Sequence, residues 1–228
     1  MTNEKELLIR RIFHLMFSLV IIYYLLPDTI FKVPKDYYLI ILIFLLPIFI
    51  EIYRLNLGVK FYGLHEKEKN HIASYVWFTT GATFLILFFP QQIAAPCILA
   101  TALGDPVIGL TKPLRRRFIF SLAFLICLVI FIIFKYDLLV AIFAAAVAFI
   151  AESFEFKIRA RLRPNLFWSR SKHKFSEYKR VFDFLFRTDD DFMMQVIPAI
   201  TLLILFSIFP ELLPQKVLYP IPVLESFL

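Results

Sequence analysis

The sequence predicts an all-α protein, built as a polytopic transmembrane helical bundle of about seven spans. Hydrophobic residues fill 60% of the 228 positions and aromatic residues fill 18%, whereas soluble domains are about 45–50% apolar. The length is sufficient for six or seven helices of roughly 20 residues, which is what a perpendicular span requires. We therefore expect a single transmembrane domain over residues 1–228, because little chain remains for a separate soluble domain.

Seven apolar segments follow one another along the chain. The first begins after a polar, basic start and ends at Pro27-Asp28 without the small-residue pattern of signal cleavage, so we expect it to stay as the first helix. The fourth and sixth segments are rich in alanine and each carries an acid, which predicts that they face the bundle interior. The segments lie at about residues 12–26, 37–53, 73–90, 93–110, 117–134, 138–154 and 192–209.

Lysine and arginine are distributed unequally between alternate connections. The N-terminus and the second, fourth and sixth connections hold 21 of the 25 basic residues. Basic residues accumulate in the cytoplasmic loops of membrane proteins. This pattern predicts a cytoplasmic N-terminus and a C-terminus outside, and it favours seven spans because one span more or fewer would mix the two sides.

The sixth connection, at about residues 155–191, is the long polar segment of the sequence. Its first part, from Phe156 to Arg163, alternates basic and apolar residues and stops at Pro164. We interpret the connection as a basic cytoplasmic loop that lies on anionic lipid headgroups, where each Lys or Arg contributes about 1 kcal/mol. Binding of a substrate's phosphate groups is the alternative interpretation.

An acid interrupts the fourth apolar segment at Gly104-Asp105-Pro106. An Asp near the centre of a span costs about 2.5–3.5 kcal/mol on the translocon insertion scale, so a compensating partner is expected. Gly104 is flexible and Pro106 lacks an N–H, so we expect the chain to leave helical geometry here against protein or a wet cavity. Asp105 is therefore a candidate site residue, with a structural pair to an arginine as the alternative.

Further acids lie at span ends assigned to the same side, and they would converge if these spans pack together. Carboxylates beside a basic rim suit Mg²⁺ held together with substrate phosphates, as phosphoryl transfer requires. For the acids and bases at helix ends, capping or an i, i+3 ion pair is the structural alternative. The acids are Asp105, Glu152, Asp190 and Asp191; the candidates for binding phosphate are Lys112, Arg115, Arg116, Arg117, Arg11 and Arg54, with His14 and Glu51 in support.

Short motifs also occur in a characteristic order. Glu6–His14 is similar to a Glu-x-x-Arg-Lys-x-x-His helix entry, and Glu51–Arg54 to a Glu-x-x-Arg helix end. Leu103–Pro106 carries a Gly-Asp motif, Ala151-Glu152 is similar to Val-Glu, and Asp189–Phe192 to Asp-Asp-Asn-Leu. In this order the motifs resemble those of the CTP-dependent lipid kinases, the family of dolichol, polyprenol and phytol kinases, which is related in pattern to the phosphatidate cytidylyltransferases. The family's Lys-Ser-x-Glu-Gly segment is missing after Asp105.

The resemblance implies an enzyme that moves the terminal phosphate of CTP to an isoprenoid alcohol, with Mg²⁺, at the cytoplasmic membrane interface. It implies catalytic roles for Asp105, Glu152 and Asp190, with Asp191 as a further metal ligand. The expected partners are a lipid alcohol, a nucleotide and membrane lipids, without nucleic acid, and a homodimer is left open. The expected location is a bacterial or archaeal plasma membrane or the endoplasmic reticulum. The alternatives are a cytidylyltransferase that forms a CDP-lipid and a divergent, non-catalytic membrane protein of the same fold.

Overall fold

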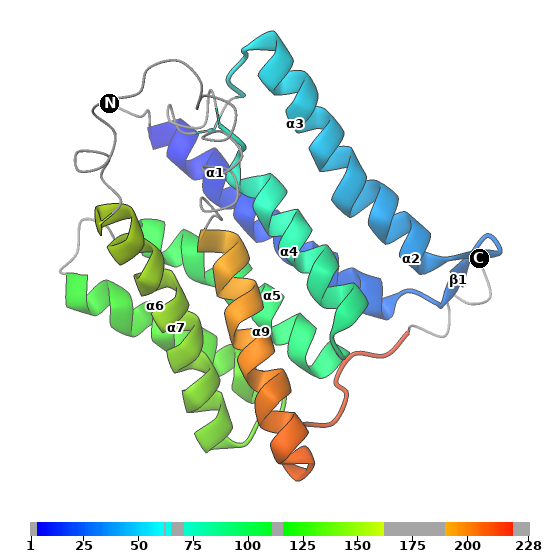
Figure 1. Ribbon diagram of the computed structural model, residues 1–228, viewed down its shortest axis with the longest axis vertical. Coiled ribbons are helices and arrows are strands. Elements are labelled where there is room, and N and C mark those ends of the chain that lie inside the picture. Colours follow the sequence, from blue (N-terminus) through cyan, green and yellow to red (C-terminus); the bar gives the residue numbers. More distant parts are fainter. Residues whose placement is uncertain (1–3, 62, 65–70, 111–115, 162–189, 221–228) are drawn as a thin grey trace, which may run out of the picture.

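Helices account for nearly all of the regular structure (Figure 1). The computed structural model describes residues 4–61, 63–64, 71–110, 116–161 and 190–220. The helical content is 78%, which confirms the predicted all-α class. The described residues also contain one two-stranded hairpin, in which Thr29 pairs with Pro34 and Ile30 with Val33.

The N-terminal part consists of a helix, the hairpin and a second long helix with an irregular middle. The second helix, residues Lys35–Leu57, is called the arm below; it ends at Gly58, whose φ of 63° is the left-handed conformation that commonly closes helices. The elements are α1 (Glu4–Phe17), the 3₁₀ helix η1 (Ser18–Leu25), β1 (Thr29–Ile30), β2 (Val33–Pro34), α2 (Lys35–Tyr38), the π-helix η2 (Leu39–Leu45) and α3 (Leu46–Leu57).

The remaining helices form the bundle, with α5 at its centre. α5 packs against α1, α4, α6 and α9, and α9 also packs along α4 and α7. Each of the seven predicted apolar segments is helical. The elements are α4 (Ser74–Phe88), α5 (Gln91–Leu110), α6 (Arg116–Ile133), α7 (Leu138–Arg161), α9 (Asp190–Ile208) and the short 3₁₀ helix η4 (Pro210–Leu212).

Most of the described alanines of α5 and α7 are buried where these helices pack against their neighbours. Small side chains allow two helix backbones to come together, and this is why the alanine-rich segments lie inward, as predicted. The two cysteines, Cys97 and Cys127, are buried in the same core as free thiols. The buried alanines are Ala94, Ala95, Ala100 and Ala102 on α5 and Ala141, Ala144, Ala145, Ala148 and Ala151 on α7.

The helix α5 does not break at Gly104-Asp105-Pro106, so the prediction that the chain leaves helical geometry there is wrong. α5 contains both Pro96 and Pro106 within its length. A proline has no N–H to donate to the carbonyl four residues earlier in the helix, but a neighbouring group can donate to that carbonyl instead. At Pro96 that carbonyl belongs to Gln92, and the Tyr136 hydroxyl donates to it at 2.8 Å. Burial raises the pKa of Tyr136, so this donor keeps its proton.

The helix α7 continues beyond its apolar segment to Arg161, so the polar connection begins later than the predicted residue 155. Glu, Lys and Arg are good helix formers, and the helix therefore extends through the first basic residues. Residues 162–189 of the predicted basic loop lie outside the described part of the chain.

Two helical stretches among the described residues are long and apolar enough to cross a membrane, Lys35–Leu57 and Asp191–Ile208. Shorter apolar helices cover Arg11–Leu25, Ser74–Phe88, Ser121–Ile133 and Leu138–Ala151. These lengths and compositions indicate membrane association, and the number of spans stays a prediction.

Candidate functional site

Buried polar side chains gather at one end of the bundle, where α3 ends at Leu57 and α4 and α9 begin at Ser74 and Asp190 (Figure 1). We call it the polar end. Burying a charge is costly unless it is paired and hydrogen-bonded, so each such residue requires a physical account. The buried polar residues there are Glu51, Arg54, Ser74, Asp191 and Gln195.

Glu51 and Arg54 form a bidentate ion pair at the end of α3. The Arg54 Nε donates to Glu51 Oε2 and its Nη2 donates to Oε1, both at 2.7 Å. The carboxylate also accepts the Ala73 backbone N–H at 2.7 Å and the Tyr75 hydroxyl at 2.8 Å. Charge-assisted bonds of this kind are short and about twice as strong as neutral ones. The pair therefore fastens the end of the arm to the start of α4.

The remaining donors of Arg54 hold the chain that connects α3 with α4. Nη1 donates to the carbonyl of Val59 at 3.3 Å, and Nη2 to the carbonyl of His71 at 2.7 Å. The arginine is fully buried. These contacts fit the ion pair that the sequence left open as the alternative for Glu51 and Arg54, rather than a guanidinium presented to a phosphate.

On α9, Asp191 and Gln195 are one helical turn apart and both are buried, at 2% and 0% exposure. Gln195 Nε2 donates to the carbonyl of Phe78 on α4 at 3.3 Å. Its Oε1 has no hydrogen-bond donor among the described residues and lies against Gly81, where a Cβ would be only 2.9 Å away. The glycine thus allows an amide to sit between α4 and α9.

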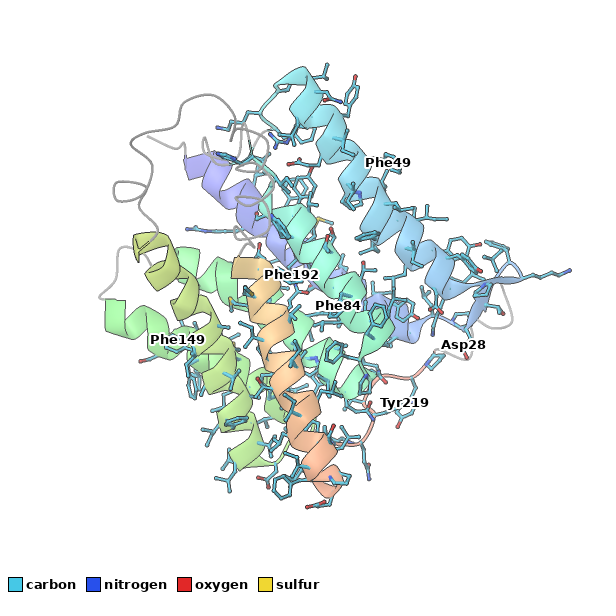
Figure 2. All side chains as sticks on the ribbon, in the orientation of Figure 1. Asp28, Phe49, Phe84, Phe149, Phe192 and Tyr219 are labelled. Carbon is cyan, nitrogen blue, oxygen red and sulfur yellow. The ribbon has the colours of Figure 1, made fainter. Side chains whose placement is uncertain are left out.

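Two aromatic rings extend the packing of α4 against α9 toward the polar end. Phe192, labelled in Figure 2 near the start of α9, meets Trp77 of α4 edge to face with ring centroids 6.1 Å apart. Such pairs contribute about 0.5–1.5 kcal/mol beyond the area that they bury. Asp191 is therefore held on a firmly packed helix end.

The predicted acids Asp105, Glu152 and Asp190 lie on α5, α7 and α9, and α9 packs against both other helices. A Cβ added at Gly104, beside Asp105, would lie 3.6 Å from Met194 Cε, which places that turn of α5 against the first turns of α9. The side chains of the three acids lie outside the described part of the structure. Convergence of their carboxylates stays a prediction.

The predicted basic residues occupy several elements. Arg11 lies on α1 and is partly buried. Arg116 and Arg117 begin α6, and His14 lies on α1; the side chains of these three are outside the described residues, as are Lys112 and Arg115 altogether. Among the described side chains, no group of three or more His, Cys, Asp or Glu residues could hold a metal, but the proposed ligands Asp105, Glu152 and Asp190 are not in that set.

Sequence reasoning did not identify Gln195 or Tyr75 as part of the polar end. Gln195 could have been recognised as an amide within the apolar seventh segment, four residues after Asp191 and hence on the same helix face. Tyr75 gives no such signal, because its partner Glu51 is 24 residues away in the chain.

Comparison of the chain with protein-family models, with curated proteins and with solved structures finds no match. The function is therefore argued from the polar end and from the order of the motifs.

Proposed function

We propose that the chain is an integral membrane enzyme that transfers the terminal phosphate of CTP to an isoprenoid alcohol, with Mg²⁺. The observation that carries the proposal is the packing of α5, α7 and α9, the three helices that bear Asp105, Glu152, Asp190 and Asp191, with Asp191 buried at the polar end. The resemblance to the CTP-dependent lipid kinases supports the same choice of residues.

In this proposal the seven helices cross the membrane, with the polar end at the cytoplasmic face. The partition of 21 of the 25 basic residues to that side supports this orientation. Large apolar side chains are also exposed on several helices; Phe49 on α3 is 63% exposed, Leu139 on α7 77% and Ile204 on α9 56%. Extensive apolar surface of this kind marks contact with membrane or protein.

The chemistry of the acids suits the proposed metal, because Mg²⁺ prefers oxygen ligands and Asp191 offers a buried carboxylate. Asp105, Glu152, Asp190 and Asp191 would hold the ion, which when bound supplies positive charge to the phosphates. The acceptor hydroxyl oxygen forms a bond to the γ-phosphorus, the bond from that phosphorus to the bridging oxygen breaks, and CDP leaves. Whichever of Glu152 and Asp190 does not hold the ion would take the hydroxyl proton.

Basic residues after Asp105 neutralise the negative charge of the nucleotide's phosphates. They replace the missing Lys-Ser-x-Glu-Gly segment in contacting these phosphates, and they are Lys112, Arg115, Arg116 and Arg117. Glu51 and Arg54 act as positioning residues, because their bonds reach Ala73 and Tyr75 at the start of α4.

The test is a transfer assay with purified protein in detergent, γ-labelled CTP, Mg²⁺ and a panel of polyprenols and phytol, with ATP in parallel. Asp105→Asn should lower transfer by about 10²–10³-fold, the usual cost of losing an electrostatic group at a reacting centre. Asp137→Asn is the matched control, because Asp137 is exposed in the α6–α7 connection and its Oδ1 accepts a bond from the Leu139 N–H that an asparagine oxygen can also accept.

The proposal and its two alternatives give different outcomes in this assay. Full activity of Asp105→Asn would exclude the proposed role of that residue. Release of pyrophosphate when a lipid phosphate is supplied in place of the alcohol would indicate the cytidylyltransferase. Retained CTP binding without transfer to any acceptor would favour the non-catalytic alternative. The absence of the Lys-Ser-x-Glu-Gly segment from the sequence favours the same alternative.

A further inference from the structure

A short hairpin precedes the arm at the end opposite the polar end, and it extends beyond the arm and away from the bundle (Figure 1). Its two-residue turn consists of Phe31 and Lys32, whose φ angles are 49° and 64°. A turn of this kind suits Asn-Gly, whereas larger residues in the left-handed conformation strain the backbone. Phe31 is 68% exposed, and Lys32 is exposed beside it. The strained turn therefore presents an aromatic ring and an ammonium group outside the fold.

Hydrogen bonds fix the base of this hairpin to the start of the arm. Lys35 Nζ donates to the carbonyl of Leu26 at 3.1 Å and lies 3.0 Å from Asp28 Oδ1. The Lys35 backbone N–H donates to the carbonyl of Asp28 at 3.0 Å, and the Tyr38 hydroxyl donates to the carbonyl of Ile30 at 3.2 Å. Because the first strand is bonded to the arm and the second runs directly into it, the turn keeps a fixed position relative to the arm.

The charged residues around the hairpin leave a positive charge at its turn. Asp28 pairs with Lys35, and Asp36 accepts a hydrogen bond from the Tyr23 hydroxyl. Among the described residues, the Lys32 side chain has no hydrogen-bond or ion-pair partner. The turn thus suits a partner that combines negative charge with apolar groups.

The arm indicates which partner this is. It is long and apolar enough to cross a membrane, and most of its apolar stretch is exposed. Tyr37 and Tyr53, near its two ends, are 58% and 65% exposed, and their separation in the chain corresponds to a rise of about 24 Å along a helix. Tyrosines are enriched at the two interfaces of a membrane, whose hydrocarbon core is about 30 Å thick. The hairpin adjoins the turn of helix that carries Tyr37, which places it at the depth of the lipid headgroups.

We propose that the hairpin turn anchors the arm at the membrane surface, with the Phe31 ring in the interfacial layer and the Lys32 ammonium on the phosphate of an anionic lipid. Aromatic and basic side chains are combined in this way in segments that lie in the interface, and a lysine near an anionic surface is attracted to it. Contact with lipid gives the exposed ring an apolar environment and offsets the strain of the turn. The inference uses the membrane location in the proposed function and none of its chemistry.

The first test measures the depth of the turn in the full chain, reconstituted in phosphatidylcholine vesicles that contain phosphatidylglycerol. Phe31→Trp keeps an aromatic ring at the turn, and the signal of the two native tryptophans is subtracted with the wild type. We expect lipids brominated near the headgroup end of the acyl chain to quench the new tryptophan more than lipids brominated near the terminal methyl. Acrylamide should reach it poorly. Gln215→Trp is the control, because Gln215 is an exposed polar residue after η4; acrylamide should quench it and the brominated lipids should not.

Two results of this test would overturn the anchor. Quenching of the tryptophan at position 31 by acrylamide as full as that of free N-acetyltryptophanamide would place the turn in water. Protection from acrylamide without quenching by either brominated lipid would indicate that protein, such as a second copy of the chain, covers the turn in place of lipid.

The second test uses the same tryptophan to measure which lipid lies beside Lys32. Brominated phosphatidylglycerol and brominated phosphatidylcholine are added in trace amounts to separate samples, and we expect the anionic lipid to be enriched about fivefold next to the turn. Lys32→Gln in the Phe31→Trp protein should abolish this enrichment. Lys135→Gln is the matched control, because Lys135 is also exposed with a positive φ, of 61°, in the α6–α7 connection. Equal quenching by the two lipids while Lys32 is present would overturn its contact with an anionic headgroup.

Both tests are read without CTP or an acceptor, so they separate the anchor from the enzyme. The expected quenching in a chain that transfers no phosphate would support the anchor while the proposed function fails. A tryptophan at position 31 in water, in a chain with full transfer activity, would overturn the anchor alone.

Discussion

Neutralising Glu51 should destabilise the protein strongly. The carboxylate accepts four hydrogen bonds, two from Arg54, one from the Ala73 N–H and one from the Tyr75 hydroxyl, at 2.7 to 2.8 Å. Glu51→Gln keeps the size of the side chain but turns an NH₂ donor toward other donors and leaves the buried guanidinium without a counter-charge. Removing one partner of a buried pair costs about 3–5 kcal/mol, and we expect a loss in this range.

The measurement is thermal unfolding in one detergent, followed by circular dichroism. A loss of that size lowers the midpoint by roughly 6–20 °C for a chain of this length. Asp28→Asn is the control, because it breaks the Lys35–Asp28 pair in which the aspartate side chain is 91% exposed, and exposed pairs contribute about 0–1 kcal/mol. A midpoint for Glu51→Gln no lower than that for Asp28→Asn would refute the reasoning.

A double variant separates the ion pair from the bonds around it. Arg54→Met should also be strongly destabilising, because it leaves the carboxylate of Glu51 buried without its counter-charge. In Glu51→Gln with Arg54→Met no unpaired charge remains, so the double variant should be less destabilised than the sum of the single variants by about 1–3 kcal/mol. Strict additivity would show that the two side chains act independently.

Two further predictions use the same unfolding assay. Gly81→Ala should lower the free energy of unfolding by about 1–3 kcal/mol, because the new Cβ would overpack against Gln195 Oε1. Gly104→Ala is the control: its Cβ would make an ordinary contact, so stability should change by less than about 1 kcal/mol. Equal unfolding midpoints for the two variants would contradict the close approach of Gln195 to Gly81. Replacing Phe31-Lys32, which have φ of 49° and 64°, by Asn-Gly should stabilise the hairpin by about 1 kcal/mol or more; a lowered midpoint would show that other contacts of these two side chains outweigh the backbone strain.

The positions of most helices could be predicted from the sequence. A long run of apolar residues that is buried or meets lipid forms a helix, because a helix satisfies its backbone hydrogen bonds internally. The segments at 73–90 and 93–110 correspond to α4 and α5 within a few residues. The inward position of the alanines was also predictable, since small residues are found where helices meet.

The candidate site was predictable only as a set of residues near one end. The sequence places Asp105, Glu152 and Asp191 at span ends on one predicted side, but it does not say which helices are neighbours. The structure adds that α9 packs against both α5 and α7. The structural role of Arg54 could not be read from its spacing to Glu51, because its other acceptors, the carbonyls of Val59 and His71, are set by the path of the connection.

The sequence by itself determined the helical class, the positions of the seven apolar segments and the accumulation of charge at alternate connections, because these depend on local composition and period. Only the tertiary structure decided that α5 stays helical through Pro106, that Gln195 sits against Gly81, and that the arm packs against α4. The last two depend on contacts between residues distant in the chain, which local preference does not specify. α5 continues through Pro106 in a bundle where it packs against α1, α4, α6 and α9.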